Sequence, residues 1–215
     1  EVYPTNIETG SRSMGIWLQG EYLYYAQPVI DEFQEQTSFY DLARLQQIDS
    51  VTFANPSKLG SELNRSFYEG TPYVTPDGNT VYYAANASEA TKYRNKERRL
   101  QKAGLSSSGD NTLNIYLTRK QGDAWSEPVL ISINSIEYNC VFPSFSPDGK
   151  YLYYASDKPG GEGGYDLYRS LKLSDSTFAE PENLGTAVNT ELDEMYPFLN
   201  DTALFFATRG LPGYG

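Results

Sequence analysis

Two glutamates occupy matching places in the chain and could form an acid–base pair. Glu69 and Glu194 each stand three residues before a proline, Pro72 and Pro197. Two carboxyl groups that flank a glycosidic bond can cleave it, one as general acid and the other as base or nucleophile. Because both glutamates take the same position in a repeated segment, a shared structural role explains them more simply. We therefore predict no catalytic residue, and carboxylate-dependent glycoside cleavage stays the alternative.

The chain has no histidine and a single cysteine, Cys140. Without histidine, Ser-His-Asp and Cys-His arrangements and histidine-bearing zinc sites are excluded. Cys140 stands three residues before Pro143, the place that the glutamates hold in their own copies. A lone cysteine forms no internal disulfide, and free cysteine packs as a small hydrophobe. We expect Cys140 to be a half-buried structural residue.

A glycine-rich run at residues 160–164 has the composition of a phosphate-binding loop. Such loops need a strand before them and a helix after them, whereas residues 165–168 have a strand pattern. We expect a flexible loop instead. Oxygen ligands for calcium could gather here from Asp157, Glu162 and Asp166, but the spacing is not that of an EF-hand. We therefore predict neither a cofactor nor a metal ion.

The densest charge lies between residues 92 and 102, where six basic side chains accompany one acid and give a local charge of +5. Residues 89–103 favour a short helix that stops at Gly104. Clustered cations steer encounters with acidic proteins or anionic polymers. The alternative is a solvated excursion that neutralises the acidic surroundings. The predicted partner-binding residues are Lys92, Arg94, Lys96, Arg98, Arg99 and Lys102.

The chain as a whole is acidic, with 17 basic and 28 acidic residues, a formal charge of −11 and a pI near 4.5. This charge repels phosphate backbones and anionic headgroups, so we expect no nucleic-acid partner. No run approaches the roughly 18 apolar residues of a membrane helix, so direct membrane insertion is not expected. The 215 residues are enough to bury a sizeable core.

A repeated segment positions these candidate residues. Residues 142–155 restate residues 72–84, and weaker copies end at Ala26 and Ala207. Both strong copies contain a Pro-Asp-Gly turn, in which proline presets φ, aspartate bonds its own backbone and glycine accepts a positive φ. The flanking tyrosine, valine and leucine residues suit a pleated sheet. Each copy therefore begins with a β-hairpin.

Two further strand-like pieces complete each copy. The third is a short Asp/Asn-aliphatic-aromatic run, as in residues 165–168, and the fourth contains a proline, namely Pro56, Pro128 or Pro181. Proline cannot donate to a strand ladder, so the fourth strand should lie at a sheet edge. Each copy is then a four-stranded antiparallel blade. The aromatic residues expected to pack between blades are Tyr24, Tyr82, Tyr153 and Phe205.

Residues 142–168 resemble the Pro-Asp-Gly propeller repeat of TolB-type proteins through Pro-Ser-Phe-Ser-Pro-Asp-Gly-Lys, Leu-Tyr-Tyr-Ala-Ser-Asp and Gly-Gly-Glu-Gly-Gly-Tyr-Asp-Leu-Tyr. Stretches 111–116, 161–168 and 183–198 are more narrowly similar to the propeller module of Bacteroidetes envelope proteins that also carry an OmpA-like peptidoglycan-binding domain. Some of those proteins belong to the type IX secretion machinery. The first and fourth copies lack the Pro-Asp-Gly motif.

The resemblance implies an all-β fold, a β-propeller of four-stranded antiparallel blades. It also implies a non-enzymatic scaffold for protein–protein interactions in the cell envelope, periplasmic and associated with the outer membrane. The implied partners are other envelope or secretion-system proteins, and peptidoglycan through a domain outside this chain. A carbohydrate-binding propeller is the alternative.

The spacing of the copies divides the chain into blade units at about residues 11–64, 65–135 and 136–190, with a partial unit at 191–215. The second unit is lengthened by the basic insertion at 86–111, between its second and third strands. A propeller usually closes by joining its last blade to its first. About three and a half blades form an incomplete propeller, so we expect a longer protein. Closure by dimerisation or by an N-terminal strand is the alternative.

Overall fold

The computed structural model describes residues 14–30, 37–61, 63–64, 69–86 and 112–212, which form strands and loops without a helix. The expected all-β class is confirmed. In chain order the strands are β1 (Met14–Gln19), β2 (Tyr22–Ile30), β3 (Thr37–Gln46), β4 (Ser57–Lys58), β5 (Glu69–Val74), β6 (Thr80–Asn86), β7 (Leu113–Gln121), β8 (Ala124–Trp125), β9 (Val129–Leu130), β10 (Cys140–Phe145), β11 (Tyr151–Ser156), β12 (Asp166–Leu171), β13 (Glu182–Asn183), β14 (Glu194–Leu199) and β15 (Leu204–Thr208).

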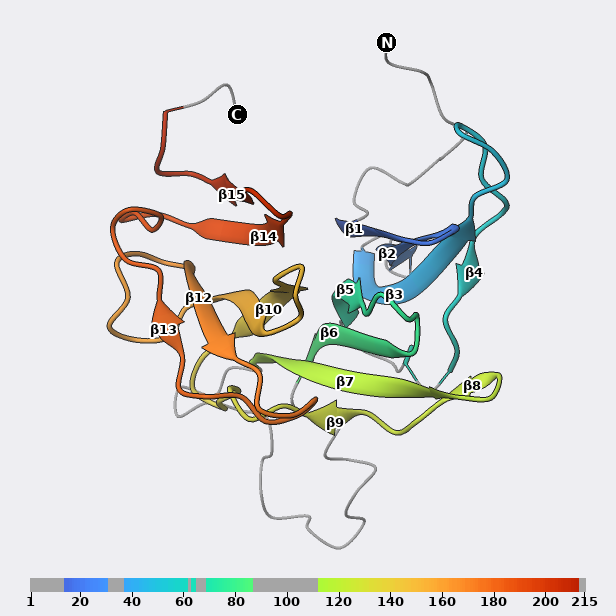
Figure 1. The fold of residues 1–215 in the computed structure, drawn as a ribbon, viewed down its shortest axis with the longest axis horizontal. Coiled ribbons are helices and arrows are strands. Elements are labelled where there is room, and N and C mark those ends of the chain that lie inside the picture. The colour runs from blue at the N-terminus through green and yellow to red at the C-terminus, as the bar shows by residue number, and fades with distance from the viewer. Residues whose placement is uncertain (1–13, 31–36, 62, 65–68, 87–111, 213–215) are drawn as a thin grey trace, which may run out of the picture.

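The strands form four antiparallel sheets around a common centre (Figure 1). The first strand of each sheet, β1, β5, β10 or β14, lies innermost and contacts the next such strand along the chain. The first and third sheets have the orders β1-β2-β3-β4 and β10-β11-β12-β13. In the second sheet, β8 and β9 both pair with β7. Three full blades and the β14–β15 hairpin thus make up a propeller.

Prolines mark the outermost strand of each full blade. Pro56, Pro128 and Pro181 come directly before the short edge strands β4, β9 and β13. Because proline has no amide hydrogen, it costs no ladder hydrogen bond at this place. The predicted edge position of the fourth strand is confirmed, and the prolines lie just outside the strands.

The two Pro-Asp-Gly turns have the same geometry. Asp77 Oδ1 accepts a hydrogen bond from the Thr75 hydroxyl at 2.6 Å, and Asp148 Oδ1 accepts one from Ser146 at 2.7 Å. The bond from Ser146 is the main reason why the pKa of Asp148 falls to about 2. The glycine after each aspartate has a φ of 70° or 69°. The predicted hairpins are therefore confirmed.

One asparagine in each full blade bonds both backbone groups of a buried residue on the third strand. Its side-chain oxygen accepts the backbone N–H, and its side-chain nitrogen donates to the C=O, over 2.6 to 3.1 Å. The asparagine side chain bonds the third strand beyond the end of the two-residue edge strand. We call these residues the asparagine clamps: Asn64 on Leu42, Asn134 on Ile115, and Asn189 on Leu167.

Aromatic side chains join neighbouring blades. Trp17 packs on Tyr73, with 4.5 Å between ring centroids, and donates a hydrogen bond from Nε1 to the Val74 carbonyl at 3.1 Å. Phe145 packs against Tyr73 at 4.9 Å and Tyr82 at 4.8 Å. Buried aromatic pairs of this kind add to the free energy gained from area burial. The inter-blade role predicted for Tyr82 is confirmed.

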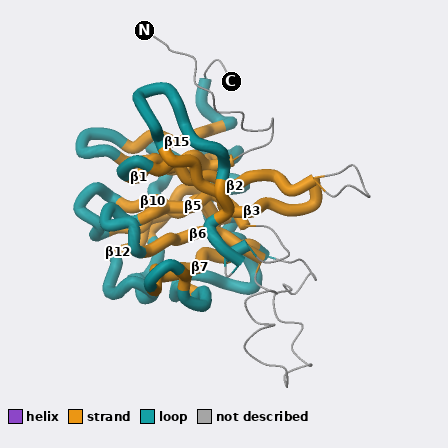
Figure 2. The backbone as a smooth tube through the Cα atoms, turned by 90° about the vertical axis from the view of Figure 1, so that its right-hand side faces the viewer, coloured by secondary structure: helices purple, strands orange, loops and turns teal. Residues whose placement is uncertain are grey.

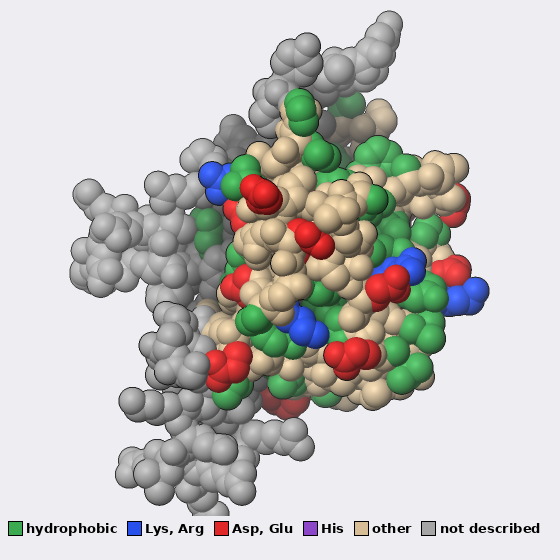
Figure 3. Space-filling model, turned by 90° about the vertical axis from the view of Figure 1, so that its left-hand side faces the viewer, with side chains coloured by type: hydrophobic (Ala, Val, Ile, Leu, Met, Phe, Trp, Pro, Cys, Tyr) green, Lys and Arg blue, Asp and Glu red, His purple; other side chains and the backbone are tan. Residues whose placement is uncertain are grey.

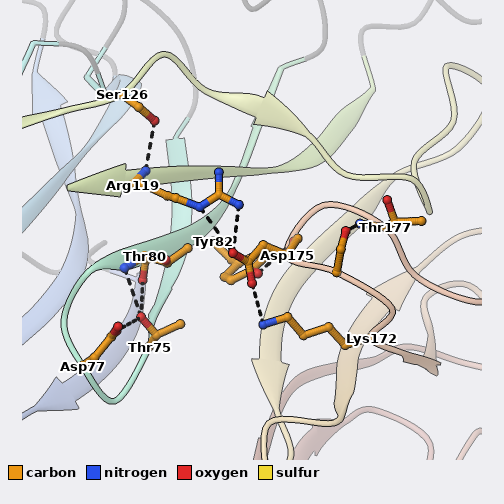
Figure 4. Close-up of polar contacts among 10 residues, drawn as sticks. Thr75, Asp77, Thr80, Tyr82, Arg119, Ser126, Lys172, Asp175 and Thr177 are labelled. Atoms are coloured by element: carbon orange, nitrogen blue, oxygen red, sulfur yellow. Dashed lines mark hydrogen bonds and ion pairs between the residues drawn. The ribbon is translucent and has the colours of Figure 1, made fainter. Parts of the chain in front are cut away.

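A polar bridge also ties the second blade to the third (Figure 4). Arg119 on β7 donates to Asp175 from Nε at 3.3 Å and from Nη2 at 2.8 Å, and Lys172 Nζ lies 2.8 Å from the same carboxylate. The Tyr82 hydroxyl donates to the Asp175 carbonyl at 2.8 Å. Hydrogen bonds from Lys172 and Arg119 lower the pKa of Asp175. One loop of the third blade is thereby held against β6 and β7.

The outer aromatic residues of the last hairpin differ from their equivalents. Tyr24 and Tyr82 are buried and Tyr153 is half-buried, whereas Phe205 is 53% exposed and the adjacent Phe198 is 45% exposed. This position faces the next blade along the chain, and no further blade is described after β15. The prediction that Phe205 packs between blades is therefore wrong for the described structure.

The β2–β3 hairpin extends beyond the other strands (Figure 2). On the side of the third blade, acidic and basic side chains are scattered among uncharged ones (Figure 3). The basic insertion joins β6 to β7, and the helix predicted within it lies outside the described residues. Among the described elements, none is a helix capable of crossing a membrane.

Candidate functional site

Each innermost strand contains a β-bulge at the same place. In β10, Phe142 and Pro143 face the single residue Tyr154 of β11, and β1, β5 and β14 have the same two-against-one pairing. Proline is tolerated at the second bulge position because a bulge interrupts the ladder. The four bulged pairs are Gly15-Ile16, Thr71-Pro72, Phe142-Pro143 and Tyr196-Pro197.

The first residue of each bulge has a positive φ. The angle is 59° at Gly15, 20° at Thr71, 57° at Phe142 and 56° at Tyr196. This conformation favours glycine, and holding a bulky residue in it costs of order 1–3 kcal/mol. Gly15 has a second reason to be glycine, since a Cβ atom there would lie 2.3 Å from Thr71 Cγ2. Phe142 and Tyr196 thus occupy positions whose backbone disfavours them.

The four bulges surround a pocket of about 160 Å³ on the propeller axis. Phe142 and Tyr196 both line it, and their ring centroids lie 4.0 Å apart with an interplanar angle of 31°. We call these two residues the aromatic pair. Among the residues that the structure describes, none that lines the pocket is charged. Its lining consists of Gly15, Ile16, Trp17, Thr71, Pro72, Phe142, Pro143, Ser144, Tyr196, Pro197 and Phe198.

Two hydroxyl groups are the main polar side-chain groups of the wall besides Tyr196. Thr71 Oγ1 and Ser144 Oγ are buried and make no hydrogen bond to any residue that the structure describes. Unpaired buried hydroxyls cost free energy, and because these two oxygens are buried they present almost no polar surface to the pocket. Burial, and then the nearby Tyr40, raise the pKa of Tyr196. The pocket is therefore apolar, uncharged and sparing in polar groups.

The two glutamates do not line this pocket. Glu69 and Glu194 are the first residues of β5 and β14, and both are buried. The Glu194 carboxylate accepts hydrogen bonds from the Thr190 amide at 2.8 Å, the Thr190 hydroxyl at 2.7 Å and the Thr208 hydroxyl at 2.6 Å. Glu194 thus fastens the start of its own hairpin, the structural role that its repeat position suggested.

Cys140 is more deeply buried than expected. It begins β10 with no exposed surface, and its Sγ lies 3.8 Å from both the Ile133 carbonyl and the Ser156 hydroxyl. Burial raises the pKa of the thiol to about 12. Because the thiolate is the nucleophile, Cys140 is a packing residue.

The acidic side chains around the glycine-rich loop bond to backbone and amide groups. Asp157 accepts from the Asn139 amide at 2.6 Å, and Asp166 accepts from the Gly163 amide at 3.1 Å. Within the described ranges no three such side chains form a group that could hold a metal ion. A Cβ atom at Gly163 would meet the Leu192 carbonyl at 2.3 Å, so this glycine is needed for close packing.

The predicted partner-binding residues lie outside the described residues. The structure instead shows an axial pocket that the sequence analysis missed. The available signal was the proline repeated at positions 72, 143 and 197, because proline inside a strand marks a bulge.

No protein-family model matches the sequence, and no curated protein matches it. Solved structures with a similar fold include TolB from Acinetobacter baumannii, at 13% identity and a TM-score of 0.50, over 93% of this chain and 38% of that one. A thermostable family-43 glycoside hydrolase matches at 12% identity and 0.53, over 85% and 59%. An α-L-arabinofuranosidase from Lactobacillus brevis matches at 16% and 0.50, over 79% and 51%. This chain spans less than two thirds of each protein, and the likeness establishes the β-propeller fold.

Proposed function

We propose that this chain is a non-enzymatic propeller that mediates protein–protein contacts through its axial pocket. The observation that carries the proposal is the composition of the wall, whose described residues are mostly apolar or aromatic and include no charged residue. Cleavage of a glycoside would need two carboxyl groups facing the substrate. Glu69 and Glu194 lie outside the wall, and Glu194 is already bonded to Thr190 and Thr208.

The cellular setting of the proposal is the bacterial envelope. The sequence resemblance over residues 142–168 and 183–198 supports a periplasmic, outer-membrane-associated scaffold, with envelope or secretion-system proteins as partners. In this proposal the chain belongs to an OmpA-family protein of the type IX secretion machinery and reaches peptidoglycan through a separate domain. The basic residues at 92–102 form a second docking element. Reversing the charge of Arg94, Arg98 and Arg99 should weaken partner capture, and unchanged capture would remove this element.

Site-specific photo-cross-linking tests the proposed contact surface. A photoreactive phenylalanine analogue replaces Ile16, which lines the pocket and is 63% exposed. The matched control carries the analogue at Leu173, which is 62% exposed and lies outside the pocket wall. In cells that produce the protein naturally, position 16 should cross-link to a protein and position 173 should not. Equal labelling at both positions, or none at position 16, would contradict the proposal.

A carbohydrate-binding propeller is the second candidate, and the aromatic pair favours it, because aromatic faces can also pack against sugar rings. Its enzymatic form predicts hydrolysis within a polysaccharide panel, with activity lost in Glu69→Gln or Glu194→Gln. Binding without hydrolysis would instead leave a sugar-binding module. If the protein neither binds nor hydrolyses any polysaccharide in a broad panel, the second candidate is ruled out.

A further inference from the structure

We infer that Phe142 and Tyr196 determine what the axial pocket accepts, and that its ligand is a flat, uncharged side chain, proline or aromatic, on an extended peptide. This inference rests on the proposed protein-binding function and names the chemistry of the partner. It follows from the conformation of the two residues, the size of the pocket and the distribution of polar groups in its wall.

The backbone conformation at positions 142 and 196 does not favour an aromatic residue. The four bulges share one two-against-one pairing and a positive φ at the first residue, a conformation that suits Gly15 in the first bulge. Phe142 and Tyr196 take the same left-handed conformation with φ of 57° and 56°, which bulky residues adopt rarely. Strain of this kind clusters at ligand sites, where the side chain serves a purpose that outweighs it. Both residues line the pocket and their rings contact each other, so we take ligand binding in the pocket to be that purpose.

The size of the pocket limits the ligand to one ring. An apolar cavity of roughly 150 Å³ accommodates benzene, and this pocket measures about 160 Å³. A proline or an aromatic side chain is of that size. Such a ring can lie on the aromatic pair and against Pro72 and Pro143, while the peptide backbone stays outside.

The polar groups favour a peptide over a sugar. A pyranose ring carries several hydroxyl groups, and each one buried without a partner weakens binding. Besides Tyr196, the described lining has two side-chain hydroxyls, those of Thr71 and Ser144, and both are buried, while the Trp17 Nε1–H already donates to Val74. Charged side chains would find no counter-charge in this lining. A proline or aromatic residue needs few polar contacts and fits this wall.

The test is an array of hexapeptides whose central residue is proline, phenylalanine, tyrosine, serine, aspartate or lysine, printed beside neutral oligosaccharides. Wild type should retain the proline, phenylalanine and tyrosine peptides. Phe142→Gly and Tyr196→Gly should each bind them at least tenfold more weakly, whereas Phe142→Tyr, which keeps the ring, should stay within about twofold. Phe205→Ala removes a half-exposed ring outside the pocket wall and should bind as wild type does.

The outcomes separate the two proposals. Peptide binding that is unchanged in both glycine variants, or that prefers aspartate or lysine, would overturn this inference and leave a protein-binding function standing. Retention of oligosaccharides without peptides would overturn both and favour the carbohydrate candidate. Retention of nothing would overturn this inference, while cross-linking from position 16 would still decide the function. If Phe142→Gly fails to fold, Phe142→Asn serves instead, because asparagine tolerates the left-handed conformation without supplying a ring.

Discussion

The asparagine clamps and the axial bulges both recur once per blade, but their residues relate to the backbone in opposite ways. At the clamps, Asn64, Asn134 and Asn189 keep one residue type and one hydrogen-bond pattern. At the bulges the strand pairing and a positive φ are kept, while the first residue changes among glycine, threonine, phenylalanine and tyrosine. Glycine favours the positive φ found at position 15, whereas phenylalanine and tyrosine rarely adopt the positive φ of Phe142 and Tyr196.

This difference distinguishes residues that stabilise the fold from residues that we assign to ligand binding. A position filled by the same well-suited residue in every blade is explained by stability. A position where side chain and backbone conflict needs another explanation, and such conflicts are expected at functional sites. This contrast is why we place the binding function at the axis, on Phe142 and Tyr196.

Breaking a clamp should have the largest effect. Asn134→Ala leaves the buried N–H and C=O groups of Ile115 without their side-chain partner, so the free energy of unfolding should fall by about 2–4 kcal/mol. Urea unfolding measures the change. Asn79→Ala, at an exposed turn, is the matched control and should change it by less than about 0.5 kcal/mol. Equal effects of both substitutions would show that the clamps do not hold the third strands.

The first bulge can be tested with two glycines that share a conformation. Gly15 and Gly20 have φ of 59° and 57°. A Cβ atom at Gly15 would clash with the Thr71 side chain, whereas one at Gly20 would meet nothing within 4 Å. Gly20→Ala should cost about 1–2 kcal/mol from the left-handed backbone alone. Gly15→Ala adds the clash and should cost at least about 1 kcal/mol more. Thermal unfolding compares them, and equal losses would mean that the bulge adjusts freely.

The smallest effect is expected at the polar bridge between the second and third blades. Because the pKa of Asp175 is lowered in the folded state, its carboxylate adds stability above its unfolded pKa, and this is lost as pH falls through the folded pKa. Asp175→Asn should cost less than about 1 kcal/mol at pH 7, since the bridge is partly exposed. The difference from wild type should begin to shrink as pH falls below about 4, the ordinary pKa of an aspartate, and should vanish only below the lowered folded-state pKa. Asp123→Asn, at another exposed turn, is the control. A stability difference between wild type and Asp175→Asn that persists in acid would show that the ionised carboxylate is not its cause.

Much of the fold could be predicted because its signals are local. The Pro-Asp-Gly turns and the prolines before β4, β9 and β13 act within a few residues and repeat along the chain. Phe205 shows the limit of this reasoning. A repeat pattern gives the face on which Phe205 lies, but whether that face is covered depends on the neighbouring blade.

The axial pocket could not be predicted from the sequence, because its wall comes from four distant copies. Gly15, Thr71, Phe142 and Tyr196 have little in common as residue types, and the sequence relates three of them only by the proline that follows each one. The asparagine clamps were not predicted for a different reason, namely their uneven spacing. Asn64 and Asn189 stand five residues before a glutamate, whereas Asn134 stands six residues before Cys140, so the spacing breaks.

The central claim is that the aromatic pair receives a flat, uncharged side chain, and Trp17 can report on it directly. Trp17 lies in the pocket wall, and Trp125→Phe leaves it as the sole tryptophan of the chain. Titration with a peptide that has a central proline should change Trp17 emission saturably, and Phe142→Gly should abolish the change. The same saturable change with Phe142→Gly, or a change only with a lysine or aspartate peptide, would contradict the claim.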